Sequence, residues 1–210
     1  MAWRTFQESE QHVAQLASEK SRGDAFEAFV RAYLRLTPEL AIEAVWPLRE
    51  VPNDVLRTLG LPQRDIGVDF VARRRDGAVW VIQAKFRSDR ASVPWRELST
   101  FVGASGRAAF RLLVSNSVEL PRNKPVLEEQ HFGTVLFGDL VTLDADFFER
   151  WETFTAEHRP IPPTRKTPRP DQQEAIEAIT SRFVAGAEHL QLIAVSGPSR
   201  ARGIRPRGVR

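Results

Sequence analysis

The chain has 210 residues, 42% of them hydrophobic, so it is long enough for one domain of ordinary size and a short appendage. It contains no cysteine, which excludes disulfides and zinc–thiolate sites and fits a reducing cytoplasm. No apolar run approaches the roughly 18 residues of a membrane-spanning helix, and the N-terminus lacks the apolar segment of a signal peptide. The composition therefore predicts a soluble cytoplasmic protein without a membrane partner.

The basic charge is concentrated at one end of the chain. Residues 159–210 contain 10 Lys and Arg against 4 Asp and Glu, a net charge of +6, so residues 1–158 carry −3 of the chain's total of +3. The sequence pI of about 9.8 therefore describes the tail more than the body. Net charge alone does not identify the body as a nucleic-acid-binding domain, and leaves room only for a local basic patch.

The first fifty residues predict two helices and a strand. A short helix is expected over residues 5–20. Ser21 and Asp24 resemble the start of a second helix that ends before Pro38. Its apolar residues recur at helical spacing: Phe26, Phe29, Val30, Tyr33 and Leu34. A strand over 41–47 and a polar loop over 49–63 follow.

The middle of the chain predicts strands with interleaved helices. Two apolar strands within 66–86 flank the turn signal Asp76-Gly77 and predict a hairpin. We then expect helix 94–103, strand 108–115, short helix 125–130, strand 134–137 and helix 139–152. The apolar runs are too continuous for an exposed sheet, which favours an α/β fold with both sheet faces covered. Ferredoxin-like and flavodoxin-like sheets remain alternatives on this pattern.

The composition changes sharply after residue 158. Residues 159–170 include five prolines in twelve positions and predict a semi-rigid basic linker. A helix is expected over 171–183, and the segment after Ile193 lacks periodicity and is expected to be disordered. The predicted organisation is a domain at 1–158, a linker at 159–170 and a partly disordered region at 171–210.

Three polar side chains interrupt the apolar strands of the hairpin. Asp69 lies in the first strand, and Gln83 and Lys85 lie two positions apart in the second, on the same face. A two-residue turn would put Asp69 on the opposite face, whereas a three-residue loop with Gly77 in the left-handed conformation pairs Asp69 with Gln83. We therefore predict an odd-length loop or a bulge.

These side chains predict a metal-dependent phosphodiesterase site. Taken singly, each is more often a turn cap, an edge residue or a solvated lysine, but together inside apolar strands they favour a bound cation and phosphate. Asp69 would ligate Mg²⁺ with the Gln83 side-chain oxygen and the Ala84 carbonyl, since hard cations prefer oxygen ligands. Lys85 would orient the attacking water or stabilise developing charge, and Glu27 would hold a metal-bound water.

Three segments carrying these residues resemble the PD-(D/E)xK nuclease superfamily. The order is that family's: a helix glutamate within 23–27, an aspartate strand within 65–69, and a Gln-x-Lys strand within 82–86. The Gln-x-Lys ending is similar to that of the Mrr-like branch. The resemblance implies a restriction-endonuclease-like α/β/α core with a central mixed sheet, here followed by the C-terminal linker and helix. It also implies Mg²⁺-dependent DNA cleavage, with Mn²⁺ as a second candidate ion. Most members have an acid in place of Gln83, so weaker metal binding is expected.

A second resemblance follows the linker. Residues 169–176 are similar to the Q-motif that opens superfamily 2 helicase domains, with Gln172 in the adenine-contacting place; an amphipathic helix after a proline-rich linker explains the pattern equally well. Residues 196–202 contain no Gly-Lys-Ser/Thr, so no phosphate-binding loop follows. The order nuclease then helicase resembles type ISP restriction enzymes. We interpret the chain as the nuclease end of such an enzyme, ended by an imposed boundary, a truncation or a frameshift.

The predicted function is that of a DNA endonuclease domain in a restriction or related DNA-defence enzyme. Its expected partners are double-stranded DNA, a helicase region of the same polypeptide, and a second copy for double-strand cleavage. Two alternatives remain: a catalytically silent DNA-binding or coupling module with a nuclease fold, and a repair or junction-cleaving nuclease.

Overall fold

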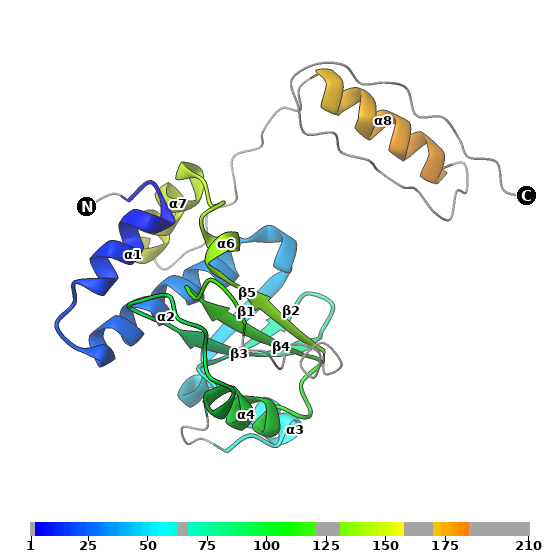
Figure 1. Cartoon of the computed structure of the whole chain (residues 1–210). Helices are drawn as coiled ribbons and strands as arrows, with labels where there is room; N and C mark the ends of the chain where they lie inside the picture. The colour runs from blue at the N-terminus through cyan, green and yellow to red at the C-terminus, as the bar shows by residue number, and fades with distance from the viewer. Residues whose placement is uncertain (1–2, 63–66, 121–130, 158–169, 185–210) are drawn as a thin grey trace, which may run out of the picture. The chain divides into compact units, whose positions relative to one another are not determined.

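The computed structural model describes residues 3–62, 67–120, 131–157 and 170–184 (Figure 1). The chain divides into two compact units, residues 1–164 and 165–210. The helix expected at 125–130, most of the linker expected at 159–170, and the tail after residue 193 lie outside the described residues, so these expectations and the predicted domain limits stay predictions.

The first unit is built on a five-stranded mixed sheet whose spatial order follows the chain order. Its strands are β1 (Ile42–Pro47), β2 (Phe70–Arg74), β3 (Val79–Lys85), β4 (Phe110–Ser115) and β5 (Phe132–Val135). Strands β1, β2 and β3 pair antiparallel, while β3, β4 and β5 pair parallel. The expected strands 41–47, 108–115 and 134–137 are confirmed with small shifts of their ends.

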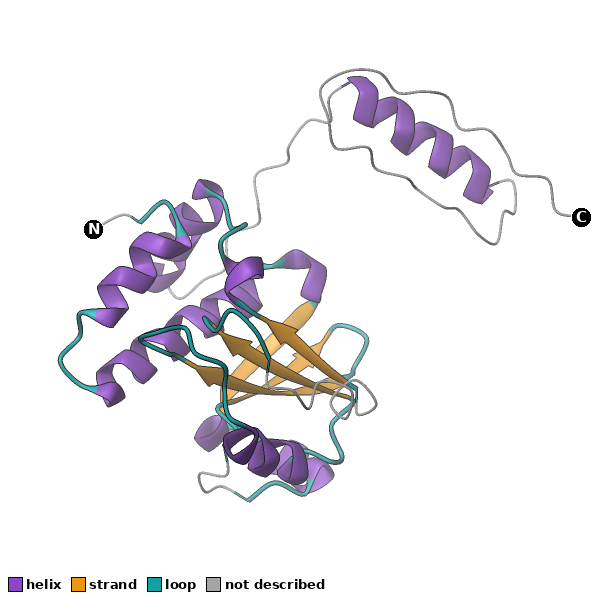
Figure 2. Ribbon diagram, viewed as in Figure 1, coloured by secondary structure: helices purple, strands orange, loops and turns teal. Residues whose placement is uncertain are grey.

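Helices cover both faces of this sheet (Figure 2). One apolar cluster joins the sheet to α1 (Phe6–Ala14), α2 (Glu19–Leu36), α6 (Phe137–Leu140) and α7 (Ala145–Glu157). A second cluster joins the opposite face to α3 (Asn53–Leu59) and α4 (Trp95–Ala104). The α/β/α architecture with a central mixed sheet is therefore confirmed.

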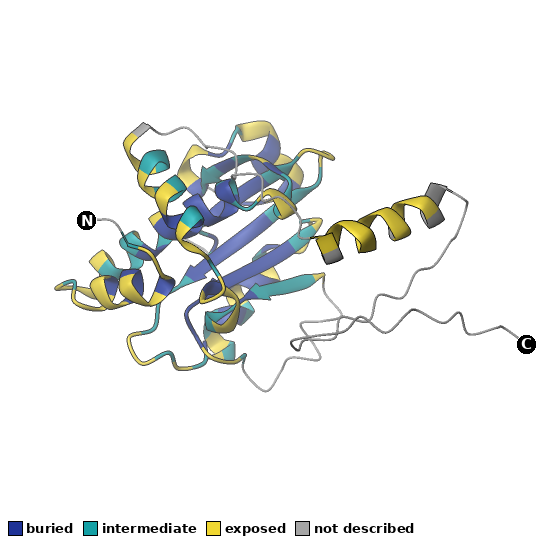
Figure 3. Cartoon of the chain, turned by 90° about the horizontal axis from the view of Figure 1, so that it is seen from above, coloured by how far each residue is buried: buried dark blue, intermediate teal, exposed yellow. Residues whose placement is uncertain are grey.

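Alternation along β3 separates the two clusters. Ile82 and Ala84 contribute to the cluster under α2, whereas Val81 contributes to the cluster under α4. All three are buried, and Figure 3 shows that burial is concentrated in the sheet and the inner sides of the helices. A strand covered on both faces must be apolar on both sides, so a polar residue on β3 needs a specific explanation.

Helix α2 buries three aromatic side chains, Phe26, Phe29 and Tyr33, in the core cluster that it shares with the sheet. Its N-cap is Ser18, whose Oγ accepts the backbone N–H of Ser21 at 3.0 Å. The predicted start at Ser21 was therefore wrong by one turn. The cap lies further upstream because the polar residues that follow Ser18 continue the same helix without contributing to its apolar face.

Three other sequence predictions were wrong. The short helix expected over 5–20 is α1, which ends at Ala14, and residues 19 and 20 already belong to α2. The expected loop at 49–63 contains α3, which buries Val55, Leu56 and Leu59 against the sheet. The expected helix at 139–152 is two helices, α6 and α7, because the Asp144 carboxylate accepts the backbone N–H of Phe147 at 3.1 Å and starts a new helix there.

The described part of the second unit is a single helix, α8 (Pro170–Val184). It agrees with the helix expected at 171–183. Across both units, no helix in the described ranges is long and apolar enough to cross a membrane.

Candidate active site

The hairpin has the register that its polar residues require. Strands β2 and β3 pair Phe70 with Ile82 and Arg73 with Val79, and one residue beyond the first pair this register puts Asp69 opposite Gln83. Residues 75–77 form a three-residue loop in which Gly77 adopts φ +85°. The predicted odd-length loop is confirmed, and Asp69 and Gln83 share a face.

Gln83 is a buried amide with an unused acceptor. The residue is 1% exposed, and its Oε1 has no hydrogen-bond partner among the described residues. A buried polar oxygen without a partner costs about 1–3 kcal/mol in stability. Such a cost inside a strand covered on both faces calls for a specific explanation, and a bound cation or water would provide one.

Gly67 makes room for this amide. It adopts φ +76°, a conformation that L side chains rarely take, and a Cβ atom there would lie 3.0 Å from Nε2 of Gln83. Both facts favour glycine, because the backbone must turn left-handed and also approach the Gln83 side chain closely.

Asp69 is fixed from several directions. Its backbone N–H donates to the Ile82 carbonyl at 3.0 Å, and its backbone carbonyl accepts from Leu48 in a 3₁₀ turn, Leu48–Glu50, at 3.1 Å. Its Oδ2 accepts the backbone N–H of Ala84 at 2.7 Å. This bond orients the Asp69 carboxylate towards the end of β3.

Lys85 and Glu27 approach each other from different elements. Lys85 ends β3, and its backbone carbonyl accepts the hydroxyl of Ser115 at 2.8 Å. Glu27 is half-buried on α2; burial raises its pKa above the usual value, the negative charge of Asp24 raises it further, and the Lys85 ammonium opposes both effects. Glu27 therefore lies within electrostatic range of Lys85, although α2 packs on the Ile82 and Ala84 face of β3, opposite to the face of Gln83 and Lys85.

The donor set suits a hard divalent cation. It offers the Asp69 carboxylate, the orphaned Gln83 Oε1 and the Ala84 backbone carbonyl, all oxygen atoms of the kind that Mg²⁺ binds. Within the described ranges, no group of three or more His, Asp or Glu side chains could hold a metal ion.

A restriction endonuclease family model of the Mrr type matches residues 37–147, which is more than half of the chain. The chain belongs to the Mrr-like restriction endonuclease family. Asp69, Gln83 and Lys85 lie inside the matched stretch. Helix α2 and Glu27 lie outside it, so the assignment of Glu27 depends on the structure and the sequence motif alone.

Two solved structures resemble this Mrr-like domain. One is the "ATP-dependent Type ISP restriction-modification enzyme LlaBIII bound to DNA", with 25% identity and a TM-score of 0.57 over 85% of this chain. The chain spans only 11% of that protein's length. The other is the "MspJI Restriction Endonuclease in Complex with 27-mer Oligonucleotide", at 18% identity and a TM-score of 0.37, covering 78% of this chain and 41% of that one. No curated protein matches.

The sequence did not reveal a polar network beside the Mrr-like motif. Asn116 is fully buried after β4 and hydrogen-bonds Glu10 of α1, 106 positions away, at 2.8 Å. Glu10 is itself buried and pairs with Arg90 at 2.5 Å. The only local signal was the run Ser115-Asn116-Ser117, three polar residues at the end of an apolar strand.

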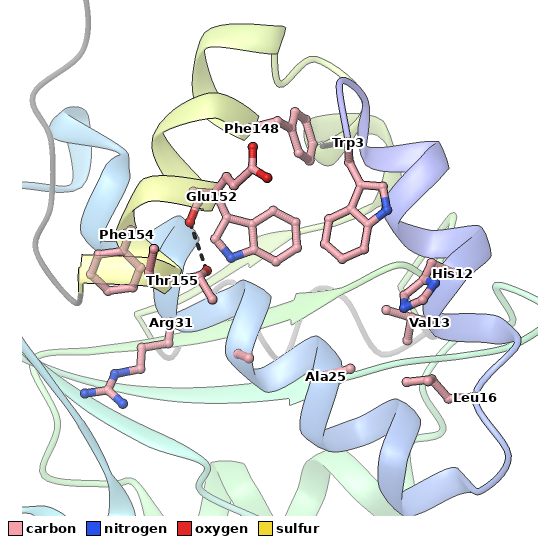
Figure 4. A pocket seen from close by; sticks show the side chains of 13 residues that line it. Trp3, His12, Val13, Leu16, Ala25, Arg31, Phe148, Glu152, Phe154 and Thr155 are labelled. Carbon is pink, nitrogen blue, oxygen red and sulfur yellow. Dashed lines mark hydrogen bonds between the residues drawn. The ribbon is translucent and has the colours of Figure 1, made fainter. Parts of the chain in front are cut away.

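An apolar groove lies away from this site. Its volume is about 660 Å³, and it is bounded by α1, α2 and α7, with Trp3 on its α1 side (Figure 4). The rings of Trp3 and Trp151 both line it, with their centres 5.0 Å apart. None of the predicted catalytic residues lines it. Gln172 is exposed on α8, in the second unit, and its expected adenine contact stays a prediction.

Proposed function

We propose that this domain is a Mg²⁺-dependent endonuclease that hydrolyses phosphodiester bonds of double-stranded DNA. The observation that carries the proposal is the side-chain oxygen of Gln83, which is buried without a hydrogen-bond partner among the described residues. Gln83 lies opposite Asp69 and two residues before Lys85, on the same face of β3. A buried acceptor beside an oriented carboxylate and a lysine is an arrangement that a cation and a phosphate would complete.

Each residue has a distinct role in this proposal. Asp69, the Gln83 side-chain oxygen and the Ala84 carbonyl would hold the ion, which when bound lowers the pKa of a water and neutralises charge on the phosphate. Lys85 orients that water and stabilises the charge that develops in the transition state. Glu27 would accept a hydrogen bond from the attacking water and help to place it.

The LlaBIII likeness supports the wider setting. That structure is an ATP-dependent restriction–modification enzyme bound to DNA, and this chain spans a small part of it. We propose that the domain acts within a similar restriction enzyme, with a helicase or translocase region in the same native polypeptide and ATP near Gln172. Cutting both strands would need two domains, brought together transiently.

A plasmid-nicking assay with Mg²⁺ or Mn²⁺ tests the proposal. We expect Asp69→Asn and Lys85→Met each to lower the cleavage rate on the order of 10²-fold or more, because each removes a group that acts on the reacting phosphate. Matched controls are Asp54→Asn and Arg57→Met, two exposed residues of α3 that should leave the rate unchanged.

Two outcomes would contradict this function. Cleavage that survives both Asp69→Asn and Lys85→Met would show that another site cuts the DNA. Binding of DNA without cleavage in either metal would instead favour the catalytically silent binding module. Preferential cutting of branched over linear duplexes would point to junction cleavage by the same residues.

A further inference from the structure

The site face of β3 continues beyond its last residue. Phe86 turns towards α2 and packs on Phe26, with ring centres 5.7 Å apart. Arg87 points the other way and donates from Nη2 to Oε2 of Glu97 on α4, at 2.6 Å. Because the alternation persists, Arg87 lies on the face of Gln83 and Lys85, roughly 7 Å along the chain from Lys85.

A buried frame holds the Arg87 backbone in place. The side chain of Asn116 accepts the Arg87 N–H at 2.6 Å and donates to the Arg87 carbonyl at 2.7 Å. Asn116 is fully buried, and the Glu10 carboxylate of α1 anchors the same amide group at 2.8 Å. The Arg87 carbonyl also accepts the Arg90 N–H at 3.2 Å, which closes a turn. Together these bonds fix the Arg87 backbone and so set the direction of its side chain.

The guanidinium of Arg87 is incompletely satisfied. Its Nε is buried and makes no hydrogen bond within the described part of the chain, although Nη2 is paired with Glu97. The side chains of Arg87 and Glu97 are 25% and 34% exposed, so the pair can be reached from solvent. A guanidinium presents a fork of donors that matches a phosphate as well as a carboxylate. A phosphate could therefore replace Glu97 and also satisfy the unused donor.

We propose that Arg87 forms a phosphate-binding subsite next to the catalytic residues, where it binds a DNA phosphate neighbouring the one that is cleaved. Glu97 holds the guanidinium in place until DNA displaces the carboxylate. The proposal rests on DNA being the substrate of the proposed function, and adds a residue outside the motif that contacts the DNA backbone. The ion pair with Glu97 also keeps Arg87 neutralised when DNA is absent.

The two partners should affect DNA binding in opposite directions. Binding of the full chain to a labelled duplex is measured in EDTA, which prevents metal-dependent cleavage, over 50–200 mM salt, about the range in which phosphate contacts weaken. Arg87→Met should weaken DNA binding. It should also make the slope of log K against log salt shallower by about 0.9, which is the contribution of one phosphate contact. Across this salt range the wild-type affinity should therefore fall roughly threefold more than that of the variant. Glu97→Gln should strengthen binding.

A second ion pair provides the matched control. Arg150 and Asp146 of α7 pair at 3.0 Å with side chains 11% and 26% exposed, and they lie on the other helix layer. Arg150→Met and Asp146→Asn should alter thermal stability without changing the salt slope. Arg87→Lys keeps the charge but loses the fork, so the slope should be retained while affinity falls.

A purely structural Arg87–Glu97 pair would give a different result. Both variants would then lower the melting temperature and neither would change the salt slope, which overturns the subsite. The test of the Arg87 subsite and the test of endonuclease activity can fail independently of each other. Wild-type protein that binds DNA but never cuts it contradicts the endonuclease, while the slope of Arg87→Met still decides the phosphate contact.

Discussion

Replacing Gly67 with alanine tests how tightly the backbone positions the Gln83 amide. Gly67 has φ +76°, and an added Cβ would lie 3.0 Å from Nε2 of Gln83 and 3.8 Å from Cβ of Phe101. The left-handed conformation costs an L residue roughly 1–2 kcal/mol. The contact with the amide adds a displacement of Gln83 by a few tenths of an ångström, since 3.0 Å is at the limit of real Cβ contacts.

Gly77 offers a matched control in the same hairpin. It has φ +85°, and a Cβ there would have no atom within 4 Å. Gly67→Ala and Gly77→Ala should each lose about 1–2 kcal/mol of unfolding free energy, which is a fall of roughly 2–4 °C in melting temperature per kcal/mol in a domain of this size. Only Gly67→Ala should also disturb the proposed ligand.

The assay combines urea unfolding with cleavage rates over a range of Mg²⁺ concentrations. We expect Gly77→Ala to cleave at the wild-type rate under conditions where it is folded. Gly67→Ala should cut more slowly, by less than the roughly 10²-fold that a 1 Å misplacement causes, and should need more Mg²⁺. If both variants lose equal stability and keep equal, wild-type cleavage and Mg²⁺ dependence, Gln83 does not need the placement that Gly67 permits.

Three further predictions concern charge near the site. Gln83→Glu should bind Mg²⁺ several-fold more tightly, because it adds a carboxylate ligand, and should be less stable than wild type without metal; thermal unfolding with and without Mg²⁺ checks both. Asp24→Asn removes a charge that raises the pKa of Glu27, so Glu27 ionises at lower pH and the acid limb of the pH–rate profile of cleavage should move to lower pH. Glu10→Gln should lose about 1.5–3 kcal/mol in urea unfolding, because the buried carboxylate pairs with Arg90 through two hydrogen bonds.

The hairpin could be predicted in detail because its information is local. Side-chain alternation and the parity of the loop together fix which residues face Asp69. Two-residue and three-residue turns both fit the sequence around Gly77, and the requirement that Asp69 face Gln83 chose the three-residue loop that the structure has. The same locality explains why β1, β4 and α4 were found close to their observed limits. In these segments, apolar runs and flanking prolines act over a few residues.

The remaining structure depends on contacts that local patterns do not contain. Helix α3 follows Pro52 and is mostly polar outside, so its three buried residues, Val55, Leu56 and Leu59, were too few to distinguish it from a loop. The frame around Arg87 joins Asn116 to a glutamate 106 positions earlier. No spacing rule indicates such a pair, because it arises only when α1 packs beside the end of the sheet.

The charges of the proposed site imply that metal and DNA bind together. Asp69 supplies one carboxylate, Gln83 is neutral, and Lys85 adds a positive charge close to Glu27, whose own ionisation is opposed by burial and by Asp24. Such a set attracts a divalent cation weakly by itself. A DNA phosphate at the same place supplies the missing negative charge and a further oxygen ligand. By reciprocity, the factor by which DNA tightens Mg²⁺ binding must equal the factor by which Mg²⁺ tightens DNA binding. The neutral amide, which makes the site a poor metal site in isolation, would therefore restrict metal loading to the DNA-bound enzyme.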